Sequence, residues 1–136
     1  MFIDTSALIA IMTGEAEQEV FTNAIMESES KYISGLVRLE TVMALSRKIK
    51  QAPLENLHTL DRLLTALEIE CAPLTHEIST LAVEAFAKFG KGQGHPAQLN
   101  LSDCMSYAAA KHLRVPLLCK GDDFGRTDVE VVRVKG

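Results

Sequence analysis

The sequence begins with the stretch MFIDTSALIAIM, residues 1–12, which combines a short strand, a carboxylate and an apolar helix. Residues 2–3 form an apolar strand that runs directly into Asp4-Thr5-Ser6, three residue types that favour the start of a helix. Residues 7–12 are all apolar, so they predict a helix that is buried on every side and ends at Gly14. A carboxylate between two buried segments is costly unless a hydrogen bond or a metal ion stabilises it.

Short apolar segments alternate with amphipathic ones along the rest of the chain. The spacing of apolar residues predicts helices over residues 15–26 and 35–50, from Pro53, from Thr75, and over 102–113. Strands are predicted at residues 32–33, 69–73, 115–119 and 129–134, with a loop at 90–99. The core stripe of the 35–50 helix is predicted to be Leu36, Leu39, Val42, Met43 and Ser46. This alternation predicts an α/β fold in which helices cover both faces of a mainly parallel sheet.

The size and composition of the chain fit one compact domain spanning residues 1–136. Hydrophobic residues make up 47% of the chain, which is enough for a buried core. No run of about 18 apolar residues is present and Asp4 argues against a signal peptide, so we expect a cytoplasmic protein that does not enter a membrane. The three cysteines lack the spacing of a zinc or redox site.

The net charge of −4 does not indicate nucleic-acid binding by an overall basic surface, but the charge is unevenly distributed. Residues 86–126 carry six basic and three acidic side chains, a local excess of three positive charges. Lys91 and Lys120 lie in this segment and are predicted to contact a phosphate-rich substrate. Acids that hold metal ions also lower the charge counted from a sequence, so an acidic total is compatible with such a substrate.

This fold class has its ligand sites beyond the carboxyl ends of the strands, and the fold could bring four acids together there. Asp4 ends the first strand, and Glu40 lies on an early helix. Asp103 opens the helix before the 115–119 strand, and Asp122 follows that strand. Each also has an ordinary local role, as a helix cap, a first-turn acid, a solvated helix residue or a turn former.

A site of carboxylates alone selects hard cations such as Mg²⁺ or Mn²⁺. Such ions activate water and clamp a phosphodiester, so the set predicts a metal-dependent phosphodiesterase or nuclease. Two other functions stay open: an aspartyl-phosphate phosphohydrolase with Asp4 as nucleophile, and a non-catalytic binding module whose acids are structural. Ser6 counts against the phosphohydrolase, because enzymes of the haloacid-dehalogenase type usually have a second aspartate at that position.

Over essentially its whole length the chain resembles PIN-domain ribonucleases, and specifically the VapC-type toxins of type II toxin–antitoxin systems. The resemblance rests on an ordered set of blocks: MFIDTSAL (1–8), RLET (38–41), FGKG (89–92), LNLSDC (99–104), SYA (106–108), LLCKGDDF (117–124) and TD (127–128). The complete ordered set is far more specific than any one block.

This resemblance implies a Rossmann-like three-layer α/β/α sandwich with a mainly parallel sheet. It implies an endoribonuclease that needs Mg²⁺ or Mn²⁺ and cleaves RNA by metal-activated water. The implied acidic site, catalytic and metal-binding, consists of Asp4, Glu40, Asp103 and Asp122. The resemblance also implies a homodimer and a cognate VapB-type antitoxin whose C-terminal segment blocks the site.

The chain departs from the common family pattern at two places. Many PIN domains carry their last acid in a threonine-x-aspartate block, whereas this chain has CKGDD at residues 119–123. Asp123 and the more distant Asp128 are therefore alternatives to Asp122 as the fourth acid. Many relatives also have glycine before the third acid, where this chain has Ser102.

Overall fold

The sheet at the centre of the molecule is parallel, as the sequence predicts. The computed structural model describes residues 1–134, so the last two residues of the expected 1–136 domain lie outside the described part. The sheet has the order β3-β2-β1-β4, with all neighbours parallel. Its strands are β1 (Phe2–Ile3), β2 (Tyr32–Ser34), β3 (Glu70–Ala72) and β4 (Leu117–Leu118).

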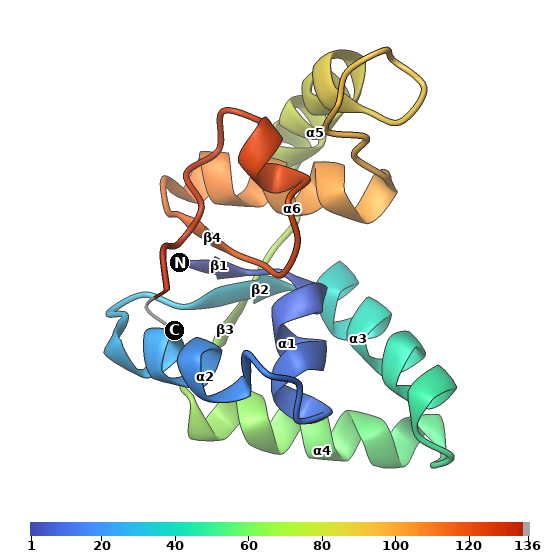
Figure 1. The fold of residues 1–136 in the computed structure, drawn as a ribbon, viewed down its shortest axis with the longest axis vertical. Coiled ribbons are helices and arrows are strands. Elements are labelled where there is room, and N and C mark those ends of the chain that lie inside the picture. The colour runs from blue at the N-terminus through green and yellow to red at the C-terminus, as the bar shows by residue number, and fades with distance from the viewer. Residues whose placement is uncertain (135–136) are drawn as a thin grey trace.

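Helices cover the sheet on both faces, which gives the three layers expected of an α/β/α sandwich (Figure 1). One layer contains α1 (Thr5–Met12), α2 (Gln18–Glu27), α3 (Gly35–Lys48) and α4 (Pro53–Ala66). The other contains α5 (His76–Phe89), α6 (Leu101–Leu113) and the short 3-10 helix η1 (Phe124–Arg126). Over residues 1–134, none of these helices has the length and apolar character that crossing a membrane would require.

The sequence explains where the helices begin. Asp4, Ser34 and Thr75 cap α1, α3 and α5, each accepting a hydrogen bond from a backbone N–H in the first turn. Pro53 occupies the first turn of α4, where its missing N–H has no helical partner to lose. Most residues of α1 are buried, as its largely apolar sequence predicts.

The order of the strands determines where a ligand site can form. The chain builds β1, β2 and β3 in one direction and then crosses by α5 and α6 to place β4 on the opposite side of β1. In parallel α/β sheets, ligands bind beyond the carboxyl ends of the strands at such a reversal. This crevice lies past Ile3 of β1 and Leu118 of β4, where Asp4 and the loop at 119–123 follow.

The predicted strand at residues 129–134 is wrong. This segment makes only an isolated parallel bridge between Leu117 and Val131. Two backbone hydrogen bonds, both 2.8 Å, attach it there: Leu117 N–H to the Glu130 carbonyl, and Val132 N–H to the Leu117 carbonyl. The segment lies at the β4 edge of the sheet, and its apolar residues pack on the core without a continuous ladder.

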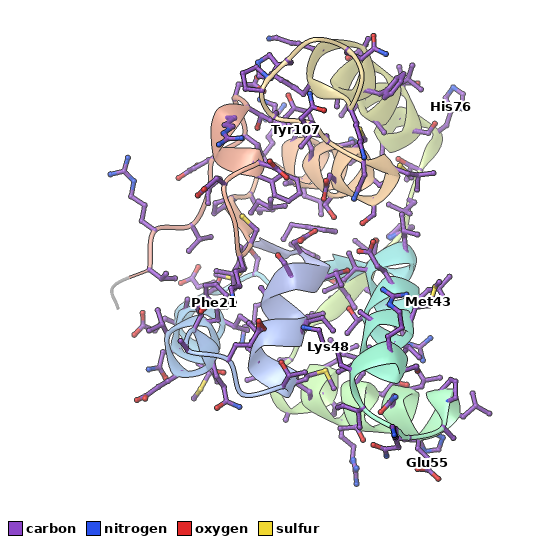
Figure 2. The ribbon with its side chains drawn as sticks, turned by 45° about the vertical axis from the view of Figure 1, so that its right-hand side comes forward. Phe21, Met43, Lys48, Glu55, His76 and Tyr107 are labelled. Atoms are coloured by element: carbon purple, nitrogen blue, oxygen red, sulfur yellow. The ribbon has the colours of Figure 1, made fainter. Side chains whose placement is uncertain are left out.

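The predicted core stripe of α3 is wrong at Leu39 and Met43, although Val42 does pack against the core. The buried residues are Val37, Thr41 and Leu45, which repeat every four positions. Leu39 and Met43 are instead 57% and 51% exposed, and Figure 2 shows Met43 projecting outward from α3. Both sides of this helix carry apolar residues, so periodicity alone could not identify the side that packs on α1 and α4.

Candidate active site

Asp4 is at the end of β1 and is both a helix cap and a buried acid. Its Oδ2 accepts hydrogen bonds from the Ser6 backbone N–H at 3.1 Å and from the Ser6 hydroxyl at 2.7 Å. Its Oδ1 is buried and has no hydrogen-bond partner among the described residues. Burial raises the pKa of Asp4 above its ordinary value; the Ser6 hydrogen bonds and a weaker interaction with the Ser106 side chain oppose that shift, and the charge of Glu40 adds to it.

Asp103 is in the first turn of α6, where a capping box holds it. The Asn100 side chain accepts from the Asp103 N–H at 2.8 Å, and Asp103 Oδ2 accepts from the Asn100 N–H at 3.1 Å. Burial is the largest cause that raises the pKa of Asp103 to about 6; the charges of Asp4, Asp123 and Glu40 contribute to the rise, and the hydrogen bond from Asn100 opposes it. Asp103 is therefore close enough to three other acids for their charges to affect its pKa.

Glu40 reaches the same region from the opposite helical layer. It lies on α3, and its Oε1 accepts a hydrogen bond of 2.7 Å from the Ser102 hydroxyl on α6. Its charge raises the pKa of both Asp4 and Asp103, although burial is the larger cause of each shift. The structure thus brings three of the four predicted acids, from β1, α3 and α6, into mutual electrostatic contact.

The fourth predicted position lies in the exposed turn after β4, which holds Asp122 and Asp123. Asp123 is the one whose charge raises the pKa of Asp103, after burial. Asp122 instead acts on the Cys119 thiol, whose pKa is raised to about 12 by burial first and then by nearby acids. Phe124 is 4% exposed, so its ring packs inward and anchors the turn.

Asp128, the distant alternative, has other partners. The Tyr107 hydroxyl donates a short hydrogen bond to Asp128 Oδ1, and Lys111 Nζ lies 3.2 Å from Asp128 Oδ2. The hydrogen bond from Tyr107, followed by that from Lys111, holds the pKa of Asp128 below its ordinary value despite some burial. These contacts attach the segment after η1 to α6.

Ser6 and Lys120 connect the ends of β1 and β4. The Ser6 hydroxyl that donates to Asp4 also accepts the Lys120 backbone N–H at 2.9 Å. The Lys120 ammonium lies 2.9 Å from Glu15 and 3.1 Å from Glu17, so it pairs with acids of the α1–α2 connection. Spacing along the chain could not reveal this pairing, because Lys120 and Glu15 are 105 positions apart.

The acids are near one another but do not form a closed set of metal ligands. Among residues 1–134, no group of three or more Asp, Glu, His or Cys side chains is arranged to hold a metal ion. Among these acids, Asp4 Oδ1 is a buried carboxylate oxygen without a hydrogen-bond partner, whereas Oδ2 accepts from Ser6. The region contains several partly buried carboxylates that repel one another.

The raised pKa of Asp103 predicts how pH affects the metal-free protein. A carboxyl whose pKa rises from 3.8 unfolded to about 6 folded keeps its proton longer in the native state. The protonated carboxyl therefore contributes to the stability of the folded protein. This contribution is complete below pH 3.8, the unfolded pKa, and is lost as pH rises through about 6. We therefore expect the free energy of unfolding of Asp103→Asn to rise relative to that of the natural chain as pH increases from 4 to 7. The total rise should be about 2 kcal/mol after allowing for solvent screening.

The measurement is the Tm of both proteins in EDTA across this pH range. The variant keeps a side-chain acceptor for the Asn100 N–H, so the capping box stays in place. A difference in Tm that does not change with pH would contradict the raised pKa.

Comparison with known proteins agrees with this fold and extends it. The sequence pattern of the PIN domain family matches residues 1–130. Ribonuclease VapC28 of Mycobacterium tuberculosis is 39% identical over 130 residues, which cover 96% of each chain. The fold and the family pattern together define a PIN domain, and the chain belongs to that family. More particularly, its similarity to VapC28 over nearly the full length shows that it is a homologue of the VapC ribonucleases.

Solved structures with the same fold include toxins and toxin–antitoxin complexes. VapC20 of Mycobacterium tuberculosis, described as a toxin that cleaves the sarcin-ricin loop, superposes with a TM-score of 0.76 at 17% identity, covering 97% of this chain and 98% of that one. VapBC2 of Rickettsia felis, bound to a promoter DNA fragment, gives a TM-score of 0.75 at 16% identity, covering 98% of both chains. At these identities the likeness establishes the shared fold.

Proposed function

We propose that this protein is the toxin of a toxin–antitoxin pair and a Mg²⁺- or Mn²⁺-dependent endoribonuclease. The observation that carries the proposal is the convergence of Asp4, Glu40 and Asp103 from three separate elements. Ser102, the neighbour of Asp103, donates a hydrogen bond of 2.7 Å to Glu40, and the charges of Asp4 and Glu40 both raise the pKa of Asp103. Acids gathered in this way repel one another unless a cation or a proton neutralises them. The ribonuclease relatives, such as VapC28, support RNA as the substrate.

The residues present fit a divalent cation. Asp4 Oδ1 is a buried carboxylate oxygen without a hydrogen-bond partner, and such an oxygen is a suitable ligand for a hard cation. Asp4 and Asp103 would hold the main ion, Glu40 would hold or orient the attacking water, and Asp122 would complete the second metal position or its water shell. When bound, the ion lowers the pKa of water and offsets charge on the leaving oxygen.

The chain's own residues have separate tasks in this reaction. Ser6 fixes the Asp4 carboxylate through Oδ2 and leaves Oδ1 free to act as a ligand. The capping box fixes Asp103 at the start of α6, next to Asp4. Lys91 is exposed and adjoins Leu99 and Asn100, near the start of α6, so it is available to contact an RNA phosphate. Lys120 is engaged with Glu15 and Glu17 and serves chiefly to attach the β4 turn.

The fourth acid is tested by a matched pair of variants, Asp122→Asn and Asp123→Asn. We keep Asp122 as the proposed fourth acid, and its loss should reduce cleavage about a hundredfold, the effect of ~3 kcal/mol in an electrostatic site. Asp123→Asn should cost much less. Both are measured on one RNA at saturating Mn²⁺. If Asp123→Asn is the inactive variant, as its electrostatic contact with Asp103 would favour, the assignment moves by one residue.

Two protein partners belong to this proposal: a VapB-type antitoxin whose C-terminal segment blocks the acidic site, and a second copy of the chain. The toxin–antitoxin complex that shares this fold supports the first. An apolar face on α3, α5 and α6 supports the second. Its residues are large, hydrophobic and exposed: Leu39, Met43, Val83, Phe86 and Leu101. Soluble monomers rarely expose apolar patches of this kind.

The homodimer is tested at Leu101, which is 74% exposed and contributes to the apolar grooves on both of its sides. Leu101→Lys should shift the protein from dimer to monomer, because it puts a charge at the centre of the face without disturbing the core. Light scattering coupled to size-exclusion chromatography measures the mass. Leu54→Lys is the control, since Leu54 is 71% exposed on α4, outside this face. An unchanged mass for Leu101→Lys would place the contact elsewhere.

The function itself is tested by incubating the purified chain with RNA and mapping the new ends. Discrete ends that depend on Mn²⁺ and on Asp4 support the proposal. A trapped covalent phosphate on Asp4 would favour the aspartyl-phosphate phosphohydrolase instead. Absence of both cleavage and Mn²⁺ binding would favour a non-catalytic PIN-like binding module.

A further inference from the structure

Ser102 makes the contact that joins Glu40 to the helix carrying Asp103. Its hydroxyl donates to Glu40 Oε1 at 2.7 Å, across 62 positions of sequence and between two helical layers. Ser102 is 8% exposed, so little water competes for the hydroxyl. No other side-chain hydrogen bond joins α3 to α6 in the described part of the chain.

The position of Ser102 in α6 excludes the usual reason for a serine near a helix start. Serine favours that place because its hydroxyl caps free N–H groups. Here Asn100 and Asp103 already form a reciprocal capping box. The Ser102 hydroxyl is therefore not needed for α6, and its observed acceptor is a side chain of α3.

Without the hydrogen bond from Ser102, the Glu40 carboxylate would tend to rotate toward solvent. Glu40 faces the charges of Asp4 and Asp103, and like charges repel. A glutamate has three rotatable side-chain bonds, and Glu40 is only half-buried, so water is within its reach. A hydrogen bond from a buried hydroxyl to the charged form opposes that rotation.

We propose that Ser102 is a positioning residue that holds the Glu40 carboxylate toward Asp4 and Asp103. This inference rests on the proposed function, since Glu40 needs that orientation only if it binds an ion or its water. Ser102 acts through Glu40 and does not touch RNA. Groups that orient metal ligands in this way are worth about 10- to 100-fold in metal affinity or activity when removed.

The test compares Ser102→Ala, Ser102→Thr and the control Ser79→Ala. Ser79 is on α5, and its hydroxyl donates to the backbone carbonyl of His76. Ser102→Ala should weaken Mn²⁺ binding, measured calorimetrically without RNA, about 10- to 100-fold and lower kcat more than KM. Ser102→Thr keeps a hydroxyl and should restore most of both, while Ser79→Ala should match the natural protein. Equal Mn²⁺ affinity in Ser102→Ala and the natural chain would overturn the proposal.

A double-variant experiment shows whether Ser102 works through Glu40. In a Glu40→Gln background, adding Ser102→Ala should cause no further loss of Mn²⁺ affinity, because the carboxylate it positions is gone. The same loss in both backgrounds would mean that Ser102 acts by another route, and the proposal would fail.

A crystal structure of metal-free Ser102→Ala provides a readout that is independent of catalysis. The Glu40 carboxylate should rotate toward solvent, whereas an unmoved carboxylate would overturn the proposal. If the natural chain fails to cleave RNA, the proposed function fails, and the position of Glu40 in these crystals still decides the role of Ser102.

Discussion

Replacing Asp4 with asparagine is expected to reduce RNA cleavage by about 100- to 1,000-fold while the fold persists. Asparagine caps a helix as well as aspartate does and can still accept from the Ser6 N–H. It removes the negative charge that would hold the ion, together with the buried Oδ1 that has no other partner. The effect therefore falls on the chemistry and leaves the first strand and α1 intact.

The measurement is initial cleavage rate at saturating Mn²⁺, with circular dichroism and Tm for the fold. Asp61→Asn is the matched control: it also removes one carboxylate, but Asp61 is on α4, which carries none of the proposed site acids, and it pairs with Arg38 of α3. Full activity in Asp4→Asn would show that Asp4 is not a ligand. Equal losses in the two variants would point to a general charge effect.

Removal of divalent cations is the second change with a large expected effect. Cleavage should be lost in excess EDTA and return when Mn²⁺ or Mg²⁺ is restored, because oxygen ligands alone select hard cations. The fold should persist, since Asp4 and Asp103 are both held by hydrogen bonds within the protein. Calorimetric titration with Mn²⁺ should give binding to the natural chain and much weaker binding to Asp4→Asn.

Unchanged cleavage in EDTA, with trace metal excluded, would contradict the metal mechanism. It would leave the ribonuclease assignment in place, because cleavage itself would still be observed. A chain that binds Mn²⁺ but cleaves no RNA would give the opposite result and would remove the assignment while keeping the cation site.

The layers of the fold could be predicted from the sequence because each depends on local pattern. The buried strand at 2–3, the apolar helix after it and the caps at Asp4 and Thr75 are local signals, and the structure confirms them. The prediction of a strand at 129–134 failed because a valine-rich segment has the same sequence pattern whether it forms a β-ladder or only packs against the edge of a sheet. The prediction of the buried face of α3 failed because the exposed face also carries apolar residues.

The candidate site was partly predictable for a similar reason. Residues that follow strands of a parallel sheet gather at one edge, so Asp4 and the turn after β4 could be expected to meet. The choice between Asp122 and Asp123 depends on how a turn is rotated, which no periodicity records. The partners of Lys120 and of Glu40 come from segments far away in the chain, and only the folded structure reveals them.

The double role of Asp4 has a consequence for mutational surveys of this protein. One carboxylate begins α1 through Oδ2 and offers Oδ1 to the crevice, so a survey of all substitutions at position 4 would record nearly every one as inactive. Those failures would have two different origins. Alanine or valine would also lose the cap, at about 1 kcal/mol of stability, whereas asparagine keeps the cap, removes a buried charge and would lose activity without any loss of stability. Abundance and activity must therefore be scored separately at this position, since a growth screen by itself would merge a folding defect with a chemical one.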